Sequence, residues 1–374
     1  MKILEICTFS AGICGVWSRV REESMRLAKK GHKIRIFTSN HVKGTEELAS
    51  SKDKISNIEI TRFPARYLGG ESFIWWNYEK QALDFEPDVI IVHNYRQPYT
   101  TQALKIANKL RKQKEVKVFL VTHAPFVEGN ITRSWLATQI VKLYDFIIGP
   151  ATINKFDGVV TISHWEEPYL KKIGLKQGKM HYIPNGIPEE FFTYKKSKES
   201  RKILFLGRIA LKKKLETLLQ AIPFLEDKSI KIEIVGPPEA EYSSYLKNIV
   251  DKLRIKDRVT FSKPIFDTKE KIKKIDSAMV YVLPSRVEGM PQSLIEAMAR
   301  EKIVVGSDSI AIRDLIKNNK NGYLFEFDNP RSLASVLNKA INQKTKVIQR
   351  NARNSVEHFE WNNIITKIES LINS

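Results

Sequence analysis

The stretch Met279-Val-Tyr-Val-Leu-Pro-Ser-Arg-Val-Glu-Gly-Met-Pro-Gln-Ser-Leu-Ile-Glu-Ala-Met-Ala299 joins an apolar strand, a turn and a helix. Met279–Leu283 is a continuous apolar run, the turn contains Gly and Pro, and we expect the helix to begin near Pro291 or Gln292. A buried strand that leads through a short turn into a helix is the repeating unit of a parallel α/β sheet. The first N–H groups of the helix would lie at the carboxyl edge of that sheet, where they suit a phosphate.

Two carboxylates flank the start of this helix. Glu288 lies just before the turn and Glu296 lies inside the helix, and their eight-residue spacing is close to two helical turns. The two side chains could therefore face one ligand and accept hydrogen bonds from hydroxyls such as those of a sugar or a ribose. The alternative is that Glu288 is an ordinary loop residue and Glu296 a solvated helix residue.

The same alternation of short apolar runs and helical patterns continues through both halves of the chain. Continuous β-branched runs are typical of parallel strands that are covered on both faces. The sequence therefore predicts an α/β protein with two Rossmann-like, doubly wound parallel-sheet domains that face a deep cleft between them. The expected strands are Ile3–Thr8, Lys33–Thr38, Ile58–Phe63, Val89–His93, Val116–Thr122, Gly158–Ile162 and Met180–Ile183, then Lys202–Gly207, Lys231–Val235, Arg258–Phe261, Met279–Leu283 and Lys302–Gly306. The expected helices are Arg19–Lys30 and residues 213–224, 241–254, 269–277 and 292–300.

A boundary between the two halves is expected at Asn185-Gly186-Ile187-Pro188, followed by the polar stretch 194–201. We predict one domain over residues 1–190 and a second over residues 191–355. We expect residues 356–374 to form a helix that packs back toward the first domain.

The net charge of +20 is spread over the chain. Residues 1–190 carry 28 Lys and Arg against 20 Asp and Glu, and residues 191–374 carry 34 against 22. A basic field attracts nucleic acid, anionic lipid or a phosphorylated small molecule, and charge alone does not choose among them. Only two cysteines are present, and we find neither a secretory signal nor an apolar run long enough to span a membrane. We therefore expect a cytoplasmic protein.

A basic loop follows the strand that opens the second half. Gly207-Arg208-Ile-Ala-Leu-Lys212-Lys213-Lys214 lies between that strand and the next helix. A guanidinium and an ammonium group at the carboxyl end of a strand can neutralise a diphosphate. The alternative is a solvated basic loop, the usual fate of three consecutive lysines.

Two features of the first half are candidates for ligand contact. Ser10-Ala-Gly12-Ile-Cys14-Gly15 joins the first strand to the first helix, and glycine there allows a ligand to approach the backbone. Of the three glycines of G-x-G-x-x-G only two, Gly12 and Gly15, are present, so a nicotinamide cofactor is poorly supported. His123 ends another strand and would point into the expected cleft, although a lone histidine there is more often structural. His93 and His164 have less in their favour.

Taken in order, these pieces resemble the family 4 glycosyltransferases of the GT-B fold. The similarity covers nearly the whole chain, and although each piece is common, the ordered set is specific. The pieces are the first-loop glycines with Leu27-Ala28-x-x-Gly31-His32, then Thr161-Ile-Ser163, Pro184-Asn185-Gly186, Gly207-Arg208 with Lys213, Pro284-Ser285 with Glu288 and Glu296-Ala-Met-Ala, Asn321-Gly322-Tyr-Leu-Phe and the Trp361 region.

The resemblance implies a role for each candidate residue in the second half. Arg208 and Lys213 would hold the diphosphate of a nucleotide-sugar donor, linked to UDP or GDP. Glu296 would accept hydrogen bonds from the ribose hydroxyls, and Glu288 with the backbone of Gly289, Met290 and Pro291 would hold the transferred sugar. Residues 191–355 would thus be the donor-binding domain.

In the first half, residues 1–190 would be the acceptor-side domain, from which Gly15 contacts the donor and His123 lies beside the sugar near the reacting carbon. Enzymes of this family retain the configuration of the sugar and generally need no metal ion and no cofactor, because Arg, Lys and helix N–H groups neutralise the charge.

Three departures from the family pattern stand out. Cys14-Gly15 replaces the usual Gly-Gly pair of the first loop. Lys214 replaces the glycine that commonly follows the diphosphate lysine, which leaves Lys212 or Lys214 as substitutes for Lys213. If that position needs a positive φ, a side chain there costs on the order of 1 kcal/mol. Glu301 and Ile303 stand where Gly and Pro usually follow Glu-Ala-Met-Ala.

The sequence thus predicts a hexosyltransferase that acts on a hydroxyl of a glycan or a lipid-linked acceptor. The alternatives are another sugar-nucleotide enzyme of this fold, such as an epimerase or a phosphorylase, and a basic nucleic-acid-binding protein, which the dispersed charge disfavours. The aromatic segment Tyr67–Trp76 suggests peripheral contact with the anionic inner face of a membrane. Its tryptophans could equally belong to the core. The identity of the sugar and of the acceptor cannot be read from the sequence.

Overall fold

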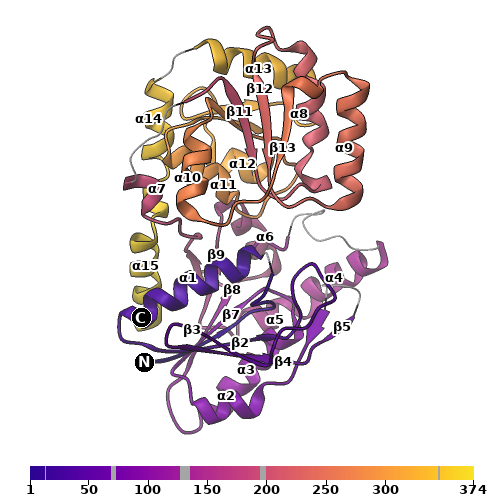
Figure 1. Ribbon diagram of the computed structural model, residues 1–374. Helices are drawn as coiled ribbons and strands as arrows, with labels where there is room; N and C mark the ends of the chain where they lie inside the picture. The colour runs from indigo at the N-terminus through magenta and orange to yellow at the C-terminus, as the bar shows by residue number, and fades with distance from the viewer. Residues whose placement is uncertain (13, 69–72, 127–134, 194–198, 344–345) are drawn as a thin grey trace. The chain divides into compact units, whose positions relative to one another are not determined.

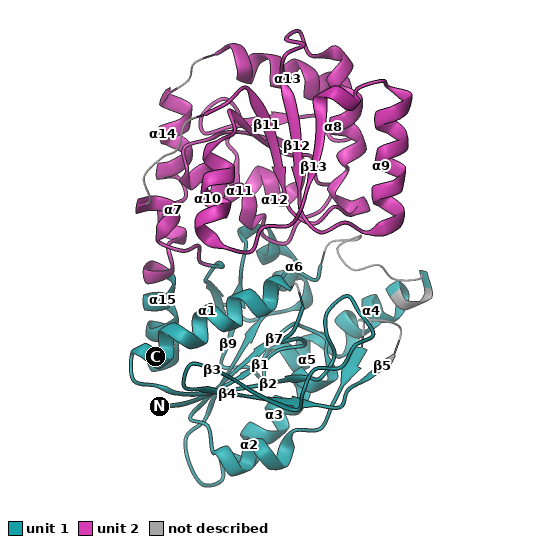
Figure 2. Cartoon of the chain, viewed as in Figure 1, with its two compact units in different colours: residues 1–185, 364–374 teal, residues 186–363 magenta. Residues whose placement is uncertain are grey.

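The computed structural model describes the chain except for residues 13, 69–72, 127–134, 194–198 and 344–345 (Figure 1). Parts of the loop before Gly15, of the aromatic segment 67–76 and of the polar stretch 194–201 therefore lie outside the described residues. The described chain divides into two compact units (Figure 2). Met1–Asn185 and Ile364–Ser374 form the first unit, and Gly186–Asn363 forms the second.

The first unit is built on a sheet in the order β10-β9-β8-β7-β1-β2-β4-β3. Neighbouring strands are parallel except β3 and β4, which form an antiparallel pair at one edge, and a separate hairpin pairs β5 with β6. Every residue of β7 and of β9 is buried, as expected of parallel strands covered on both faces. The strands are β1 Lys2–Ile6, β2 Lys33–Ser39, β3 Lys52–Ile55, β4 Ile58–Phe63, β5 Arg66–Leu68, β6 Phe73–Trp75, β7 Val89–His93, β8 Lys117–Val121, β9 Gly158–Thr161 and β10 Met180–Tyr182.

Seven helices of the described chain belong wholly or largely to this unit: α1 Gly15–Lys29, α2 Glu79–Phe85, α3 Pro98–Leu110, α4 Trp135–Ile147, α5 Gly149–Ile153, α6 Glu167–Ile173 and α15 Trp361–Asn373. α1 begins four residues before the expected start at Arg19. The residue before this helix is Cys14, whose side chain makes no capping hydrogen bond. The usual signal for a helix start is therefore missing from the sequence.

The two tryptophans of the aromatic segment have different environments. Trp76 is fully buried and stacks on Tyr99 with a ring-centroid distance of 4.1 Å, whereas Trp75 is 45% exposed. The hypothesis that both reach a membrane is therefore wrong for Trp76, because its ring forms part of the core.

The second unit has a sheet in the order β13-β12-β11-β14-β15-β16, with all neighbouring strands parallel. This is the Rossmann order 3-2-1-4-5-6, so the predicted fold class of two Rossmann-like parallel-sheet domains is confirmed. The strands are β11 Lys202–Leu206, β12 Lys231–Val235, β13 Val259–Ser262, β14 Val280–Leu283, β15 Ile303–Ser307 and β16 Tyr323–Phe325. The helices are α7 Glu190–Thr193, α8 Leu215–Ala221, α9 Ala240–Lys252, α10 Thr268–Asp276, α11 Gln292–Ala299, α12 Ile310–Leu315, α13 Pro330–Asn342 and α14 Lys346–Asn354.

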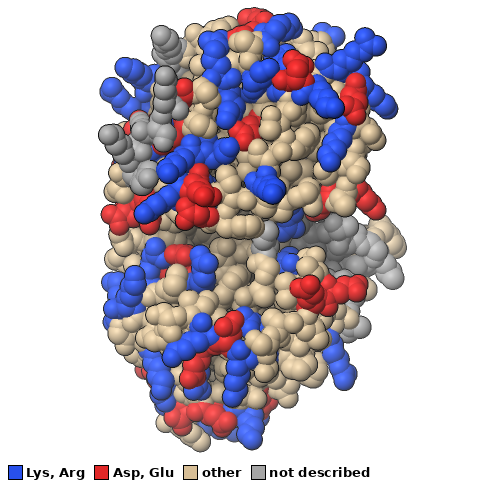
Figure 3. Space-filling model, viewed as in Figure 1, with Lys and Arg blue, Asp and Glu red and all other residues tan. Residues whose placement is uncertain are grey.

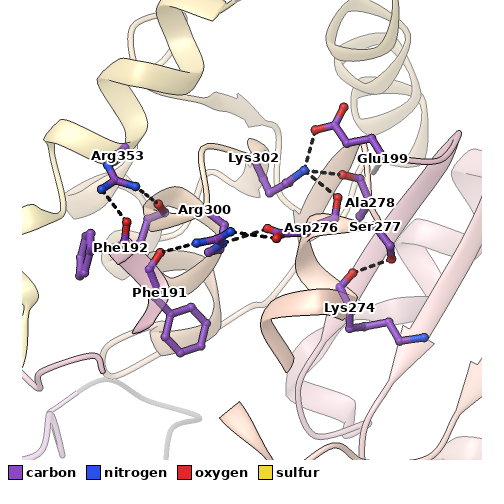
Figure 4. Close-up of polar contacts among 11 residues, drawn as sticks. Phe191, Phe192, Glu199, Lys274, Asp276, Ser277, Ala278, Arg300, Lys302 and Arg353 are labelled. Atoms are coloured by element: carbon purple, nitrogen blue, oxygen red, sulfur yellow. Dashed lines mark hydrogen bonds and ion pairs between the residues drawn. The ribbon is translucent and has the colours of Figure 1, made fainter. Parts of the chain in front are cut away.

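A buried ion pair anchors the end of α11 in this unit (Figure 4). Arg300 follows the last residue of the helix, and its Nε and Nη2 donate to the two carboxylate oxygens of Asp276 at 2.9 and 2.8 Å. Its third nitrogen donates to the carbonyl oxygen of Phe191 at 3.1 Å, and both charged side chains are about 1% exposed. The bidentate geometry fixes α11 against the end of α10 and against α7.

Glu301, the next residue, has a φ of 54°. The position where the family usually has glycine thus does require left-handed backbone. Lys214, which also replaces a glycine of the family pattern, has a positive φ of 51°. A side chain at this position therefore carries the conformational cost, on the order of 1 kcal/mol, that a positive φ imposes.

Candidate functional site

The candidate residues of the second unit lie at the topological switch point of its sheet. β11 and β14 are neighbours, but the chain forms β12 and β13 on one side before it crosses to β14 on the other. Ligands of open α/β sheets bind at the carboxyl ends of the strands beside such a point. The loop after β11 carries Arg208 and Lys213, the loop after β14 carries Glu288, and the following helix α11 carries Glu296.

A backbone hydrogen bond joins the two loops, because Arg286 N donates to Lys212 O at 2.9 Å. Lys213 Nζ lies 2.5 Å from Glu288 Oε1, and both side chains are only about one-tenth exposed, at 12% and 10%. The structure therefore brings the predicted diphosphate lysine and the predicted sugar-binding carboxylate into one ion pair. Lys214 points elsewhere and pairs with Asp328 at 3.0 Å.

Arg208 is half-buried and follows Gly207 at the end of β11. The backbone here packs closely against the loop after β12. A Cβ atom on Gly236 would lie 1.9 Å from Gly207 O, so only glycine fits at position 236. Ile209 N also donates to Pro237 O at 2.9 Å. The two loops thus hold the backbone of Arg208 at the carboxyl edge of the sheet.

Glu296 is 3% exposed, so the alternative of a solvated helix residue is wrong. Its Oε1 accepts a hydrogen bond from Lys271 Nζ at 2.7 Å. Its Oε2 is buried and has no hydrogen-bond partner within the part of the chain that the structure describes. A buried carboxylate oxygen without a donor is costly, and a hydroxyl of a bound ligand would satisfy it.

Glu288 is 9% exposed, but its spacing from Glu296 does not come from two helical turns. α11 begins at Gln292, so Glu288 lies outside the helix and the loop places it. The charges of both carboxylates nevertheless affect the pKa of the same hydroxyl group, that of Tyr281 on β14. Burial raises the pKa of Tyr281, and the charges of Glu296 and Glu288 raise it further.

Tyr281 and Lys271 also belong to this site, and no motif in the sequence points to them. Tyr281 Oη donates to Leu206 O at 3.1 Å and lies 2.7 Å from Ser293 Oγ, so it ties β11 to the start of α11. Within the same turn, Gly289 and Met290 are half-buried and Pro291 is buried. No side-chain hydrogen bond caps α11 at Pro291.

The candidate residues of the first unit flank the switch point of its own sheet, between β1 and β7. Gly15 is the first residue of α1, and a Cβ atom there would have no neighbour within 4 Å. The packing of the unit itself therefore does not require glycine at this position.

His123 follows β8 and has a φ of 56°, as does Ala124. The carboxylate of Glu166 binds the residue before this strained pair and the backbone N–H of its second residue. Its Oε2 accepts from Thr122 Oγ1 at 2.5 Å and from Ala124 N at 2.8 Å. Its Oε1 accepts from Ile162 N at 2.8 Å. Glu166 is fully buried, and the sequence prediction overlooked it.

The His123 ring is half-buried and, contrary to the expectation of a lone histidine, has a histidine partner. Its Nε2 lies 2.8 Å from Nδ1 of His93, and Nε2 of His93 lies 2.9 Å from Oε2 of Glu5. Burial lowers the pKa of His123 well below its ordinary value, and His93 and Arg19 lower it further. At neutral pH His123 is therefore uncharged. His164, in contrast, is exposed, and its Nδ1 lies 2.8 Å from Oε1 of Glu167.

Within the described residues, no three His, Cys, Asp or Glu side chains are grouped so that they could hold a metal ion. In the same residues we find no helix with the length and apolar character needed to cross a membrane.

Two family models match the chain one after the other. The model described as Glycosyltransferase Family 4 matches residues 13–191, and the model described as Glycosyl transferases group 1 matches residues 186–355.

Curated relatives are similar over part of their length. The uncharacterized glycosyltransferase MJ1607 of Methanocaldococcus jannaschii is 29% identical over 226 residues, 55% of this chain and 57% of the relative. The amylovoran biosynthesis glycosyltransferase AmsK of Erwinia amylovora is 28% identical over 265 residues, 68% of this chain and 61% of the relative. The chain thus spans somewhat more than half the length of each.

Solved structures agree over the full chain. Alr3699/HepE of Anabaena, in complex with UDP, has a TM-score of 0.78 at 16% identity, with all of both chains covered. At this identity the likeness concerns the fold, which is that of two Rossmann-like domains. The family models, matched in chain order over two such sheets, confirm the resemblance seen in the sequence: the chain belongs to the family 4 glycosyltransferases, the glycosyl transferases of group 1.

Proposed function

We propose that the protein is a retaining hexosyltransferase that moves a sugar from a nucleotide diphosphate to a hydroxyl of a glycan or lipid-linked acceptor, without a metal ion. The observation that carries the proposal is the arrangement at the second switch point. Two cationic side chains, those of Arg208 and Lys213, follow β11. Two buried carboxylates, those of Glu288 and Glu296, follow β14. The orphan oxygen of Glu296 suits a ribose hydroxyl.

In the proposed site, Lys213 changes partner when the donor binds. Without ligand its charge is balanced by Glu288. A diphosphate offers more negative charge and competes for the ammonium group, which frees Glu288 to accept hydrogen bonds from the sugar hydroxyls. Arg208 binds the same diphosphate and stabilises the charge that develops as the C1–O bond breaks. The acceptor attacks from the face that the phosphate leaves, so the sugar retains its configuration.

The donor is proposed to be a UDP-hexose rather than a GDP-hexose, because HepE has been solved with UDP and with UDP-glucose. A glycan acceptor fits AmsK, which is named for amylovoran biosynthesis. Gly15 and His123 are proposed to contact the donor from the first domain. Nucleic acid is not a proposed partner, since Figure 3 shows Lys and Arg scattered over the visible face with Asp and Glu among them.

Substitution and product analysis test this function together. Arg208→Ala and Glu288→Ala should each abolish sugar transfer while circular dichroism shows that the variant stays folded. Full activity of either variant would mean that the site lies elsewhere. A donor labelled in the sugar distinguishes the alternatives, because an epimerase returns an altered donor, a phosphorylase releases a sugar phosphate, and a transferase labels the acceptor.

We also propose that the protein is cytoplasmic and that it touches an anionic membrane through α4 rather than through the segment 67–76. Large exposed apolar side chains gather on this helix and at its end, and they include the most exposed ones of the described chain. Phe146 is 81% exposed and Trp135 is 75% exposed. The full set is Trp135, Ile140, Leu143, Phe146, Ile147 and Ile148.

An apolar helix face of this kind lies in the membrane interface when basic charge draws it to anionic lipid. A second copy of the chain is the competing occupant, but a net charge of +20 opposes self-association. The protein should float with vesicles of equal phosphatidylcholine and phosphatidylglycerol at low salt, and Leu143→Ser with Phe146→Ser should stop it. Phe266→Ser, at a residue of the second unit that is 74% exposed, is the control. A parent protein that fails to float, or that elutes as a dimer which the α4 variant dissociates, would refute membrane contact.

A further inference from the structure

Three side chains of the first unit, Glu5, His93 and His123, form a line of hydrogen bonds, and the proposed chemistry uses only the last of them. The sheet order β8-β7-β1 places His93, the last residue of β7, between Glu5 on β1 and His123 after β8. The two distances along the line are 2.9 and 2.8 Å, and the first two side chains are fully buried. One end of the line is closed in the core, and the other end is His123.

Charged neighbours from α1 cover this line without pairing with Glu5. Arg19 Nε donates to Glu23 Oε2 at 3.0 Å, and its Nη1 donates to Ile183 O at 2.9 Å. The guanidinium is thus already committed to Glu23, which is itself buried. On its own strand, Glu5 lies near the buried thiol of Cys7. The carboxyl group of Glu5 therefore receives little compensation for its burial.

Glu5 is protonated at neutral pH under these conditions. Burial raises its pKa to about 8, against the opposing effect of Arg19. Its second oxygen, Oε1, is buried without a hydrogen-bond partner in the described chain, which is far less costly for a neutral carboxyl than for a carboxylate. Burial also lowers the pKa of His93 to about 3, so this ring is neutral.

The positions of the protons then follow from one end of the line to the other. A protonated Glu5 donates to Nε2 of His93, so the proton of that neutral ring must be on Nδ1. Nδ1 of His93 in turn donates to Nε2 of His123, and the proton of His123 must be on Nδ1.

We propose that Glu5 and His93 are positioning residues that fix the ring and the tautomer of His123, so that its Nδ1–H is a hydrogen-bond donor for an oxygen of the bound nucleotide sugar. The role of His123 beside the sugar rests on the proposed function; its tautomer does not. When Glu5 loses its proton, the carboxylate must accept from His93 Nε2–H, and the direction of both hydrogen bonds reverses. His123 then offers an acceptor where the ligand requires a donor.

The tautomer can be measured without any substrate, by long-range ¹H–¹⁵N correlation of the histidine rings in the full chain. The expected result at pH 7 is a proton on Nδ1 of both His93 and His123, with a shift of both toward Nε2–H as the pH rises through about 8. Glu5→Gln should keep the Nδ1–H form at all pH values, because its amide also donates to His93 Nε2 but does not ionise. Nε2–H on His123 of the parent protein at pH 7 would overturn the proposal.

The pH profile of transfer supplies the functional test. The kcat of the parent should fall about tenfold for each pH unit above about 8, and Glu5→Gln should remove this fall while it keeps the activity at pH 7. The control variant Glu59→Gln changes an exposed residue of the same sheet that pairs with Arg35. The kcat of this variant should still fall above about pH 8. A purely structural role would give Glu5→Gln the profile of the parent, which would refute the proposal. Correct tautomers without sugar transfer would instead refute the proposed function alone.

Discussion

The two switch points share one topology but have opposite electrostatics. In the second unit, Lys213–Glu288 and Lys271–Glu296 are ion pairs with side chains between 4% and 24% exposed. In the first unit, burial of Glu5 and His93 is complete, and their shifted pKa values make both neutral. Partly exposed charges can exchange partners with a diphosphate, whereas a neutral buried line can only orient a hydrogen bond. The same strand order thus supports two kinds of ligand contact, and loops and strand-end residues decide which.

Removing the buried charge of the Asp276–Arg300 pair should give the largest change in stability. Asp276→Ala takes the carboxylate partner away from the Arg300 guanidinium, which is about 1% exposed, and loss of one partner of a buried ion pair typically costs about 3–5 kcal/mol of unfolding free energy. Urea unfolding followed by circular dichroism measures the loss. Asp308→Ala, which breaks the exposed pair with Arg313, should cost under about 1 kcal/mol. Equal losses in the two variants would show that burial does not set the strength of these pairs.

Lysine substitutions decide which ammonium binds the diphosphate. Lys213→Met should weaken UDP binding about a hundredfold, since a hydrogen bond to a charged group contributes about 1.5–3 kcal/mol. Lys212→Met and Lys214→Met serve as matched controls in the same loop, and titration calorimetry with UDP compares the three. A larger effect at Lys214 would place the diphosphate nearer to Asp328 and would contradict the role given to the Lys213–Glu288 pair.

The protonated state of Glu5 should be detectable in the pH dependence of the unfolding free energy. The folded chain keeps the proton of Glu5 up to about pH 8, whereas an unfolded chain releases it near the ordinary value of 4.5. The unfolding free energy of the parent relative to Glu5→Gln should therefore fall as the pH rises through this window, by about 1.4 kcal/mol per pH unit. Denaturant titrations at pH 5, 6 and 7 measure this difference. A constant difference would mean that Glu5 is already ionised in the folded state.

The smallest expected effect concerns backbone strain at Glu301. With a φ of 54°, Glu301→Gly should raise the unfolding free energy by up to about 1 kcal/mol. The ion pair between Glu301 and Arg353, at 3.9 Å, is too long for its removal to offset this gain. Glu301→Ala is the control, because it removes the same side chain without relieving the strain. Thermal denaturation that places the glycine variant below the alanine variant would exclude strain as the reason.

Sequence patterns predicted the long buried strands best. The bounds of Val89–His93 and Lys231–Val235 agree to the residue, because continuous apolar runs of that length have few other uses. β16 was missed because three residues, Tyr323–Phe325, are too few to show a pattern. β3 was missed because Lys52–Ile55 is mostly charged and lies at the sheet edge.

The candidate site could be predicted only where its residues follow one another in a recognisable loop. Arg208, Lys213 and Glu288 stand in such loops. Glu5 could not have been found this way, since it sits inside an apolar strand and its partner is 88 residues away. Only the spatial order of the strands, which periodicity does not contain, brings Glu5 and His93 together.

The division of α15 between the units has a consequence for synthesis. Ile364–Ser374 completes the first unit, where Glu369 pairs with Lys30 at 2.5 Å and Lys367 lies over the ring of Tyr182. Four isoleucines of this segment, Ile364, Ile365, Ile368 and Ile372, are almost fully buried. During synthesis the first unit therefore lacks this helix until the whole second unit has been translated. During that interval the nascent first unit exposes the apolar surface that these isoleucines later cover, and this surface is open to chaperones.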